Sequence, residues 1–134
     1  MSAWYHVYIK NSTTYDFMYM EGSVEPSARL INDTARWNKA PHDIESQLGA
    51  AESNAYAFDC TGSNGCTGYA DYAILDTEEN KKIGTLTLSW SVHTFGANSA
   101  SASVDTDAVR VTRDDHEDKG LEEVVHHVEV KQGI

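Results

Sequence analysis

Apolar and polar side chains alternate with a period of two along most of this chain. In the opening stretch WYHVYIK, one face of an extended backbone would carry Tyr5, Val7 and Ile9, and the other Trp4, His6 and Tyr8. A β-strand turns successive side chains to opposite faces, whereas a helix repeats about every 3.6 residues. The alternation returns in five more stretches: NAYAFD, TGYADYAIL, KIGTLTLSWSV, SASVDTDAVRVT and VVHHVEV. The pattern therefore predicts an all-β fold.

Clusters of turn-forming residues separate the expected strands. TGSNG, DTEENK, FGANS and RDDHEDKG each follow one of the alternating stretches, at a spacing near the roughly 8–12 residues that is typical of sandwiches and barrels. NSTT is expected to fold the opening strand into a hairpin with YDFMYME, residues 15–21. A chain of 134 residues is long enough for one domain with one core. We expect residues 1–134 to form a single-domain antiparallel two-sheet β-sandwich.

Two segments allow more than one interpretation. In APHDIESQLGAA, Ile44 and Leu48 stand four residues apart, as on one or two turns of helix after Pro41. The same segment is compatible with a strand followed by a loop. In residues 114–134, some apolar positions have helical spacing, but the four valines of VVHHVEV and its neighbours favour a strand. Helix remains the alternative there.

The charge balance restricts the partners. Lys and Arg total 10 against 21 Asp and Glu, for a formal net charge of −11. Such a field repels nucleic-acid phosphates and anionic membranes, but it tolerates glycans and neutral or zwitterionic lipids. The N-terminus has neither the charged start nor the apolar region of a signal peptide. We therefore expect no nucleic-acid partner and a cytoplasmic location, or release without a classical signal.

The two cysteines bracket a glycine-rich stretch, CTGSNGC. Five residues separate Cys60 from Cys66, so this is not the C-x-x-C of a redox motif. A structural zinc site needs four ligands, and no histidine lies nearby in sequence, so no metal is expected. A phosphate loop would need a Lys-Ser/Thr pair and a following helix. Two alternatives stay open: a disulfide across the tip of a hairpin, or two free thiols on facing strands.

Known catalytic motifs do not occur in the chain. It contains no G-x-S-x-G elbow and no H-E-x-x-H, and its six histidines fall in no catalytic frame. VDTDAV and RDDHED lack the spacing of a calcium loop, and both are expected to be solvated acidic segments. We expect no enzyme activity, metal or cofactor, with a small hydrolase that uses two carboxylates as a distant alternative.

A binding site is predicted around Trp90. This residue is either the last core residue of its strand or a ring exposed at the end of the sheet. Sugars stack on such rings and take hydrogen bonds from planar donors. A hairpin around FGANSA would bring Arg110 beside Trp90, although a surface ion pair is the alternative role for Arg110. The predicted carbohydrate site comprises Trp90, Arg110, Asn54, His93 and Tyr69.

An ordered series of motifs resembles the aegerolysins, small acidic fungal proteins. It runs WYHVYIKN, APHDI, TGSNGCTGYADY and LSWSVHTFGAN, over about the first hundred residues. Fungal fruit-body lectins of related fold are a more distant resemblance. The chain departs from the aegerolysin pattern at His93 and Thr94, which stand where that family has Cys-Pro. The resemblance implies a β-sandwich that binds particular membrane lipids, in some cases with a pore-forming partner.

Two functions follow as hypotheses. The first is a non-enzymatic carbohydrate-binding protein of fungal lectin type, with glycans or glycolipids as partners and a defensive, toxic role suggested by the resemblance. The alternative is an aegerolysin-like protein that binds membrane lipids through N-terminal aromatic rings: Trp4, Tyr5, Tyr8 and Tyr19. A homo-oligomer is expected under both, because weak sites gain avidity from multivalency.

Overall fold

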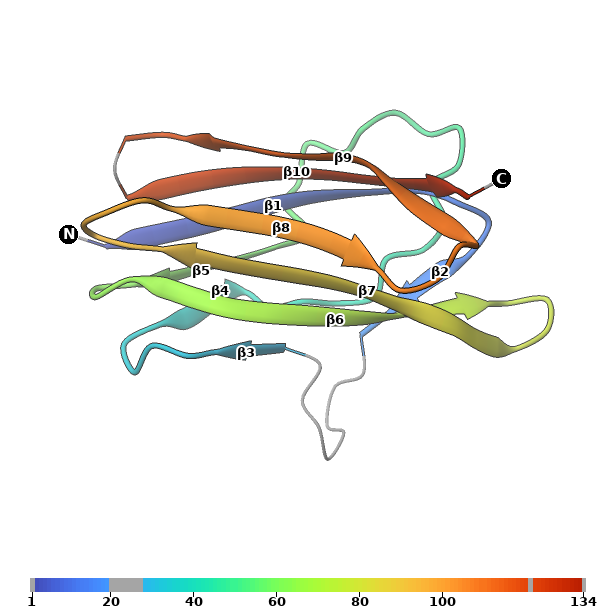
Figure 1. Ribbon diagram of the computed structural model, residues 1–134, viewed down its shortest axis with the longest axis horizontal. Helices are drawn as coiled ribbons and strands as arrows, with labels where there is room; N and C mark the ends of the chain where they lie inside the picture. Colours follow the sequence, from blue (N-terminus) through green and yellow to red (C-terminus); the bar gives the residue numbers. More distant parts are fainter. Residues whose placement is uncertain (1, 20–27, 121, 134) are drawn as a thin grey trace.

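The computed structural model places two β-sheets face to face (Figure 1), and it describes residues 2–19, 28–120 and 122–133. The first sheet has the order β4-β5-β1-β10-β9. Its strands are β4 (Arg36–Lys39), β5 (Phe58–Gly62), β1 (Ala3–Ser12), β10 (Glu123–Gln132) and β9 (Val109–Asp118). The second sheet has the order β2-β6-β7-β8, and β3 also pairs with β6. Its strands are β2 (Asp16–Met18), β6 (Cys66–Asp76), β7 (Lys81–Val92), β8 (Ser99–Val104) and β3 (Ala28–Leu30). The predicted all-β sandwich is confirmed.

The first sheet is mixed, because its two central strands run parallel. β1 pairs with β10 in parallel register, from Trp4 opposite Glu123 to Ser12 opposite Lys131. All the other pairs between named strands are antiparallel. The segment that contains VVHHVEV is therefore a strand, as its valines favoured. Its inward residues Val124, Val128 and Val130 are buried beside β1, so the two ends of the chain form the middle of one sheet.

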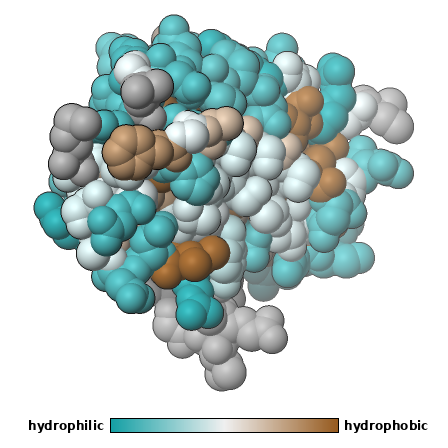
Figure 2. Space-filling model, turned by 60° about the vertical axis from the view of Figure 1, so that its left-hand side comes forward, coloured by the Kyte–Doolittle hydropathy of each residue, from teal (hydrophilic) through white to brown (hydrophobic). Residues whose placement is uncertain are grey.

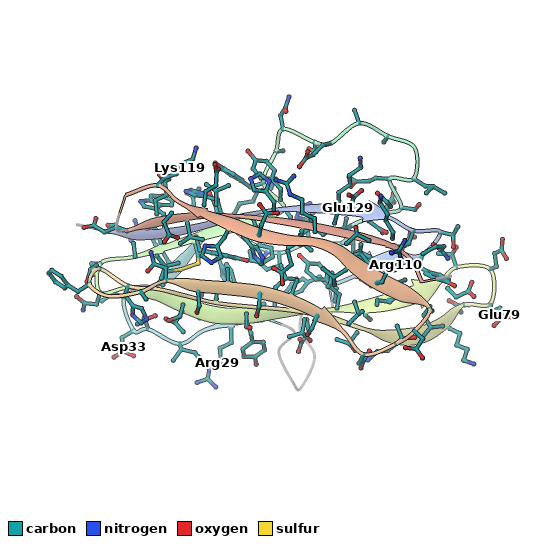
Figure 3. All side chains as sticks on the ribbon, turned by 45° about the horizontal axis from the view of Figure 1, so that its top comes forward. Arg29, Asp33, Glu79, Arg110, Lys119 and Glu129 are labelled. Atoms are coloured by element: carbon teal, nitrogen blue, oxygen red, sulfur yellow. A yellow bond between two sulfur atoms is a disulfide. The ribbon has the colours of Figure 1, made fainter. Side chains whose placement is uncertain are left out.

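The core lies between the two sheets, and the alternation seen in the sequence decides which side chains enter it. Tyr5 and Val7 of β1 are fully buried, as the period of two predicts. Leu86 and Leu88 of β7 meet them from the second sheet. Side chains from both layers fill the space between the ribbons (Figure 3). The outer side chains of β7 are mostly Ser and Thr, as expected for a face that meets solvent.

Three predicted connections are wrong, two of them because strands that are neighbours in the sequence belong to different sheets. β1 and β2 do not form a hairpin: β2 pairs with β6 in the second sheet, while Met20 and Glu21 of the predicted strand lie outside the described residues. SASVDTDAVRVT is not one strand but divides into β8 and β9. Asp105 and Asp107 lie in the turn between them, where Asp105 Oδ1 accepts a hydrogen bond of 2.6 Å from the Thr85 amide. RDDHED is not a turn, because it continues β9.

The segment after Pro41 forms neither of the predicted helical turns. Ile44 is buried and makes an isolated β-bridge with Phe17, in which each amide donates to the other's carbonyl. Leu48, four residues later, is 62% exposed. The second alternative, extended chain followed by a loop, therefore describes this segment. The loop that continues to residue 57 brings Tyr56 onto the outer face of the first sheet.

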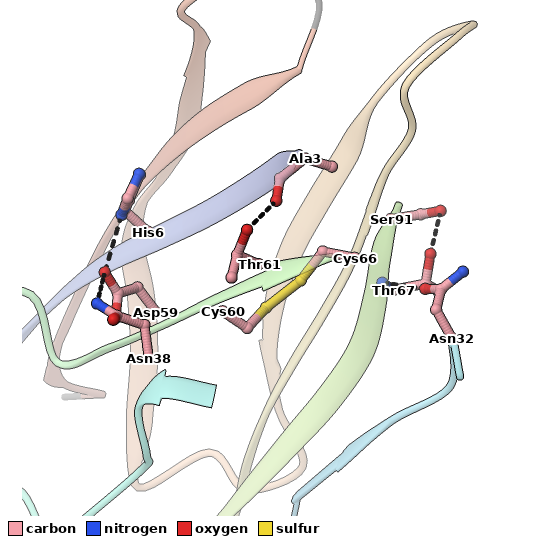
Figure 4. Close-up of a disulfide and its surroundings, with 10 residues drawn as sticks. All are labelled: Ala3, His6, Asn32, Asn38, Asp59, Cys60, Thr61, Cys66, Thr67 and Ser91. Atoms are coloured by element: carbon pink, nitrogen blue, oxygen red, sulfur yellow. Dashed lines mark hydrogen bonds and ion pairs between the residues drawn. A yellow bond between two sulfur atoms is a disulfide. The ribbon is translucent and has the colours of Figure 1, made fainter. Parts of the chain in front are cut away.

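Cys60 and Cys66 form a disulfide that joins the two sheets (Figure 4). Cys60 belongs to β5 in the first sheet, and Cys66 begins β6 in the second. The glycine-rich stretch between them is thus a crossing between layers, and the expected hairpin tip is wrong. Both cysteines are fully buried. Gly65 has a φ of +115°, a backbone conformation that residues with a Cβ rarely adopt.

Candidate functional site

Trp90 is a core residue and not a sugar platform. Its side chain is 2% exposed, and its ring stacks on Tyr5 with centroids 4.4 Å apart and planes 4° apart. Phe58 lies 5.4 Å from the same ring and Trp37 6.0 Å. Other protein rings thus occupy the surroundings that a sugar would need. The hypothesis that Trp90 is exposed at the end of the sheet and stacks on a sugar is therefore wrong. The alternative, that Trp90 is the last core residue of its strand, is correct.

Arg110 does not lie beside Trp90. It belongs to β9 in the first sheet, opposite Lys131, whereas Trp90 pairs with Gly68 and Ala100 in the second sheet. The Arg110 Nε donates to the backbone carbonyl of Gln132 at 3.2 Å. The predicted hairpin around FGANSA forms between β7 and β8, but Arg110 lies beyond it on β9, because the chain changes sheets between β8 and β9. No other described residue forms an ion pair with Arg110.

The other three predicted site residues come from three separate segments of the chain. Asn54 is exposed in the loop between β4 and β5. His93 is exposed at the end of β7, where its amide donates to Asn98 Oδ1 and its Nε2 lies 2.9 Å from Ser91 Oγ. Tyr69 points outward from the second sheet, opposite Ser89. The structure does not bring the predicted set together into one pocket.

The N-terminal aromatic rings of the lipid hypothesis also separate. Tyr5 is fully buried, so it cannot meet a membrane. Tyr19 packs near Tyr72 of the second sheet, with ring centroids 6.4 Å apart. Trp4 and Tyr8 alone share a surface, the outer face of the first sheet.

That outer face carries a continuous aromatic row, formed by Trp4, His6, Tyr56, Tyr8 and His127. Trp4 and His6 stack with centroids 5.4 Å apart, and His6 stacks on Tyr56 at 4.5 Å. Tyr56 then meets Tyr8 at 4.7 Å, and Tyr8 stacks on His127 at 5.2 Å. A contiguous row of partly exposed rings is therefore a candidate binding surface.

The register of β1 explains the row. Its even-numbered residues face outward, and the parallel pairing sets Trp4 beside Glu123 and Tyr8 beside His127. Tyr56 enters from the loop before β5. The alternation of WYHVYIK contained the signal for three of these rings, because it predicted a second face made of Trp4, His6 and Tyr8. It carried no information on the partners that other strands supply.

His6 is held between two carboxylates. Its Nδ1 lies 3.1 Å from Asp59 Oδ2, and its Nε2 lies 2.8 Å from Glu123 Oε2. Asn38 Nδ2 donates to the same Asp59 carboxylate at 3.1 Å (Figure 4). Both ring nitrogens of His6 are therefore in contact with carboxylate oxygens. The imidazole thereby fixes the position of Glu123 at the end of the row.

A cleft opens at the Trp4 end of the row, with a volume of about 480 Å³. We call it the Trp4 cleft. It is lined by Ser2, Trp4, Lys119, Gly120, Glu122 and Glu123. An indole ring, carboxylates and an ammonium group therefore share one concave surface. A second cleft of about 420 Å³ is lined mainly by the loop between β4 and β5, and Tyr56 and Lys39 are among its lining residues.

Behind the row, His126 forms a buried hydrogen-bond chain. Tyr5 Oη lies 2.7 Å from His126 Nδ1, and His126 Nε2 lies 2.6 Å from Asp114 Oδ1. Burial lowers the pKa of His126, and the nearby Asp114 carboxylate opposes that shift. Burial also raises the pKa of Tyr5 well above its ordinary value. A neutral His126 that accepts from Tyr5 and donates to Asp114 satisfies every group in the chain.

We expect acidification to destabilise the protein through His126. The unfolded chain has the ordinary histidine pKa of 6.5, whereas the folded state has a lower one. Below about pH 6.5 the unfolded state therefore binds more protons than the folded state. The free energy of unfolding decreases as the pH is lowered, until the pH is below the folded pKa. Urea unfolding at several pH values measures this. His126→Gln should flatten the decline, and an equally steep decline in that variant would contradict the assignment.

Comparisons with known proteins identify the fold. No protein-family model matches the chain, and no curated protein matches it in sequence. Its structure is similar to a solved structure titled "Crystal structure of RahU protein in complex with TRIS molecule", with a TM-score of 0.51. The match covers 98% of this chain and 94% of RahU, at 11% identity. RahU has an aegerolysin-type fold, so the fold implied by the resemblance is supported, and at this identity the likeness shows the fold alone.

No group of three or more His, Cys, Asp or Glu among the described residues is placed to hold a metal ion. No helix in the part of the chain that the structure describes is long and apolar enough to cross a membrane.

Proposed function

We propose that this protein is a non-enzymatic carbohydrate-binding protein whose binding site is the Trp4 cleft. The observation that carries the proposal is the position of Trp4, half-buried in the wall of a cleft with Glu123 and Lys119. A sugar has an apolar face of C–H groups and a rim of hydroxyls. The indole suits the first, and the carboxylate and ammonium groups suit the second. The proposal keeps the lectin-type function expected from the sequence and moves it to other residues.

The aromatic row supports this site from the side. His6 stacks on Trp4 and hydrogen-bonds to Glu123, so the ring and a polar group of the cleft are held by the same residue. Sites that are ordered before binding lose less entropy when the ligand arrives. The row also continues toward Tyr56 and Tyr8, which would give a longer glycan further rings to contact.

Replacing Trp4 by alanine is expected to weaken glycan binding by about thirtyfold, because truncation of a buried aromatic anchor typically costs about 2 kcal/mol. A glycan array identifies the ligand, and calorimetry then measures its affinity for each variant. Phe95→Ala is the matched control, since it removes an exposed ring, 87% exposed, from the turn between β7 and β8. The experiments use a buffer without Tris, because the RahU structure contains that molecule.

The outcomes separate the two sites. Binding that survives Trp4→Ala and fails in Phe95→Ala would overturn the cleft as the site. If the protein instead binds membranes through the β7–β8 turn, binding to lipid vesicles should survive Trp4→Ala and fail in Phe95→Ala. A protein that binds no glycan in the array would contradict the carbohydrate function as a whole.

Lipid binding of the aegerolysin type is the second candidate, and the exposed Phe95 favours it. Among the described residues, Ile31 is another largely exposed apolar side chain, 62% exposed. It lies near the same end of the molecule, because its amide donates to the Thr67 carbonyl and Thr67 pairs with Ser91 at the end of β7. The face in Figure 2 is nevertheless mostly hydrophilic, with separate apolar patches. Vesicles of zwitterionic lipid test this candidate beside the glycan array.

The proposal also covers the partners, the assembly and the location of the protein. The net charge of −11 disfavours a nucleic-acid partner. A homo-oligomer would give several weak clefts the avidity of one strong site, and light scattering measures its size. The proposed location is the cytoplasm, or the outside of the cell after release without a classical signal.

A further inference from the structure

The Trp4 cleft has an uneven distribution of charge. Glu122 and Glu123 face a single cation, Lys119, among the residues that line it. Glu117 and Asp118 of β9 adjoin the same end of the sheet, opposite Val125 and Val124. His6 occupies one oxygen of Glu123 and leaves the other for a ligand. The chain as a whole carries a formal charge of −11, so the local and the overall field have the same sign.

We propose that the Trp4 cleft selects sugars with a free amino group, such as oligomers of glucosamine, an inference that rests on the carbohydrate function proposed above. The ring face of an amino sugar would stack on the Trp4 indole. Its ammonium group would pair with Glu122 or Glu123 and also be attracted to the negative face of the indole. The sugar hydroxyls would form hydrogen bonds with the remaining polar groups of the cleft.

The alternatives fit the same cleft less well. An N-acetylated sugar offers the same ring with a neutral amide, so it gains nothing from the second carboxylate. A sulfated or sialylated sugar brings a negative charge toward Glu122, Glu123 and an acidic protein, and repulsion opposes its approach. The amino group is thus the feature of a sugar that the charge distribution recognises.

Three tetrasaccharides of matched length test the proposal: oligomers of glucosamine, of N-acetylglucosamine and of glucose. Calorimetry at a mildly acidic pH keeps the glucosamine amines protonated. We expect the glucosamine oligomer to bind about tenfold more tightly than the other two at low salt, since each partly exposed ion pair contributes up to about fivefold. High salt should reduce this preference, because it screens exposed charges.

Two variants assign the preference to the cleft. Glu122→Gln should weaken binding of the glucosamine oligomer about threefold to fivefold more than it weakens binding of the two neutral oligomers. Glu79→Gln makes the same change in net charge, and Figure 3 shows Glu79 at the end of the molecule opposite Lys119. This control should leave all three affinities unchanged. An equal loss in both variants would show a general charge effect and overturn the site.

The results also separate this inference from the function on which it rests. Equal affinity for the glucosamine and N-acetylglucosamine oligomers would overturn the selection of amino sugars and leave the carbohydrate function standing. Absence of binding by all three oligomers, together with an empty glycan array, would overturn both.

Discussion

Trp90→Ala is expected to lower the free energy of unfolding by about 3–5 kcal/mol, the usual cost of deleting a large aromatic side chain from a core. Trp90 is 2% exposed and packs against rings of the opposite sheet, including Tyr5 of β1 and Phe58 of β5. Its removal would leave a cavity at the centre of this cluster, and the close packing of the two layers limits how far the neighbours can move to fill it.

Urea unfolding measures this loss, and glycan affinity is measured on the same variant under conditions in which it stays folded. Trp90→Phe is the matched control, because it keeps a ring in the cluster and should cost clearly less than the alanine variant. Affinity for the ligand should stay close to that of the unchanged protein. A variant of normal stability that no longer binds glycan would restore Trp90 as the sugar platform.

The alternation of residues predicted which side of each strand faces the core, but not which strands share a sheet. It assigned Tyr5, Val7 and Ile9 to one side of β1, and all three are buried. The period of two is a property of each strand alone. Whether the chain stays in one sheet or crosses to the other depends on contacts between distant residues. The turn at Asp105 and Asp107 therefore gave no sign that β8 and β9 lie in different layers.

The same limit explains why the alternation grouped only three members of the aromatic row. Trp4, His6 and Tyr8 could be grouped because they alternate on one strand. Glu123 lies 117 residues from His6 in the chain, and only the parallel pairing of β1 with β10 brings them together. Trp90 was misassigned for a different reason: its position after Leu86 and Leu88 favoured the core, yet an end-of-sheet position was equally compatible with the pattern.

Removing the disulfide is expected to lower the free energy of unfolding by about 2 kcal/mol, because the bond closes a short loop in the unfolded chain. Cys60 and Cys66 are six positions apart and join the two layers of the sandwich. The double variant Cys60→Ala, Cys66→Ala gives the difference by urea unfolding. The loss of stability should exceed this loop-closure contribution if the volume left by the two sulfur atoms remains an empty cavity between the sheets.

A thiol titration supplies the control. Both cysteines are fully buried, so a reductant can reach the bond only when the sandwich opens. We expect no thiol to react in the native protein, even with reductant present, and two thiols to react once urea is added with the reductant. Burial would in that case let the bond persist in a reducing cytoplasm, where exposed disulfides do not. Two thiols that react in the native protein from the start would contradict the cross-link and favour the free pair.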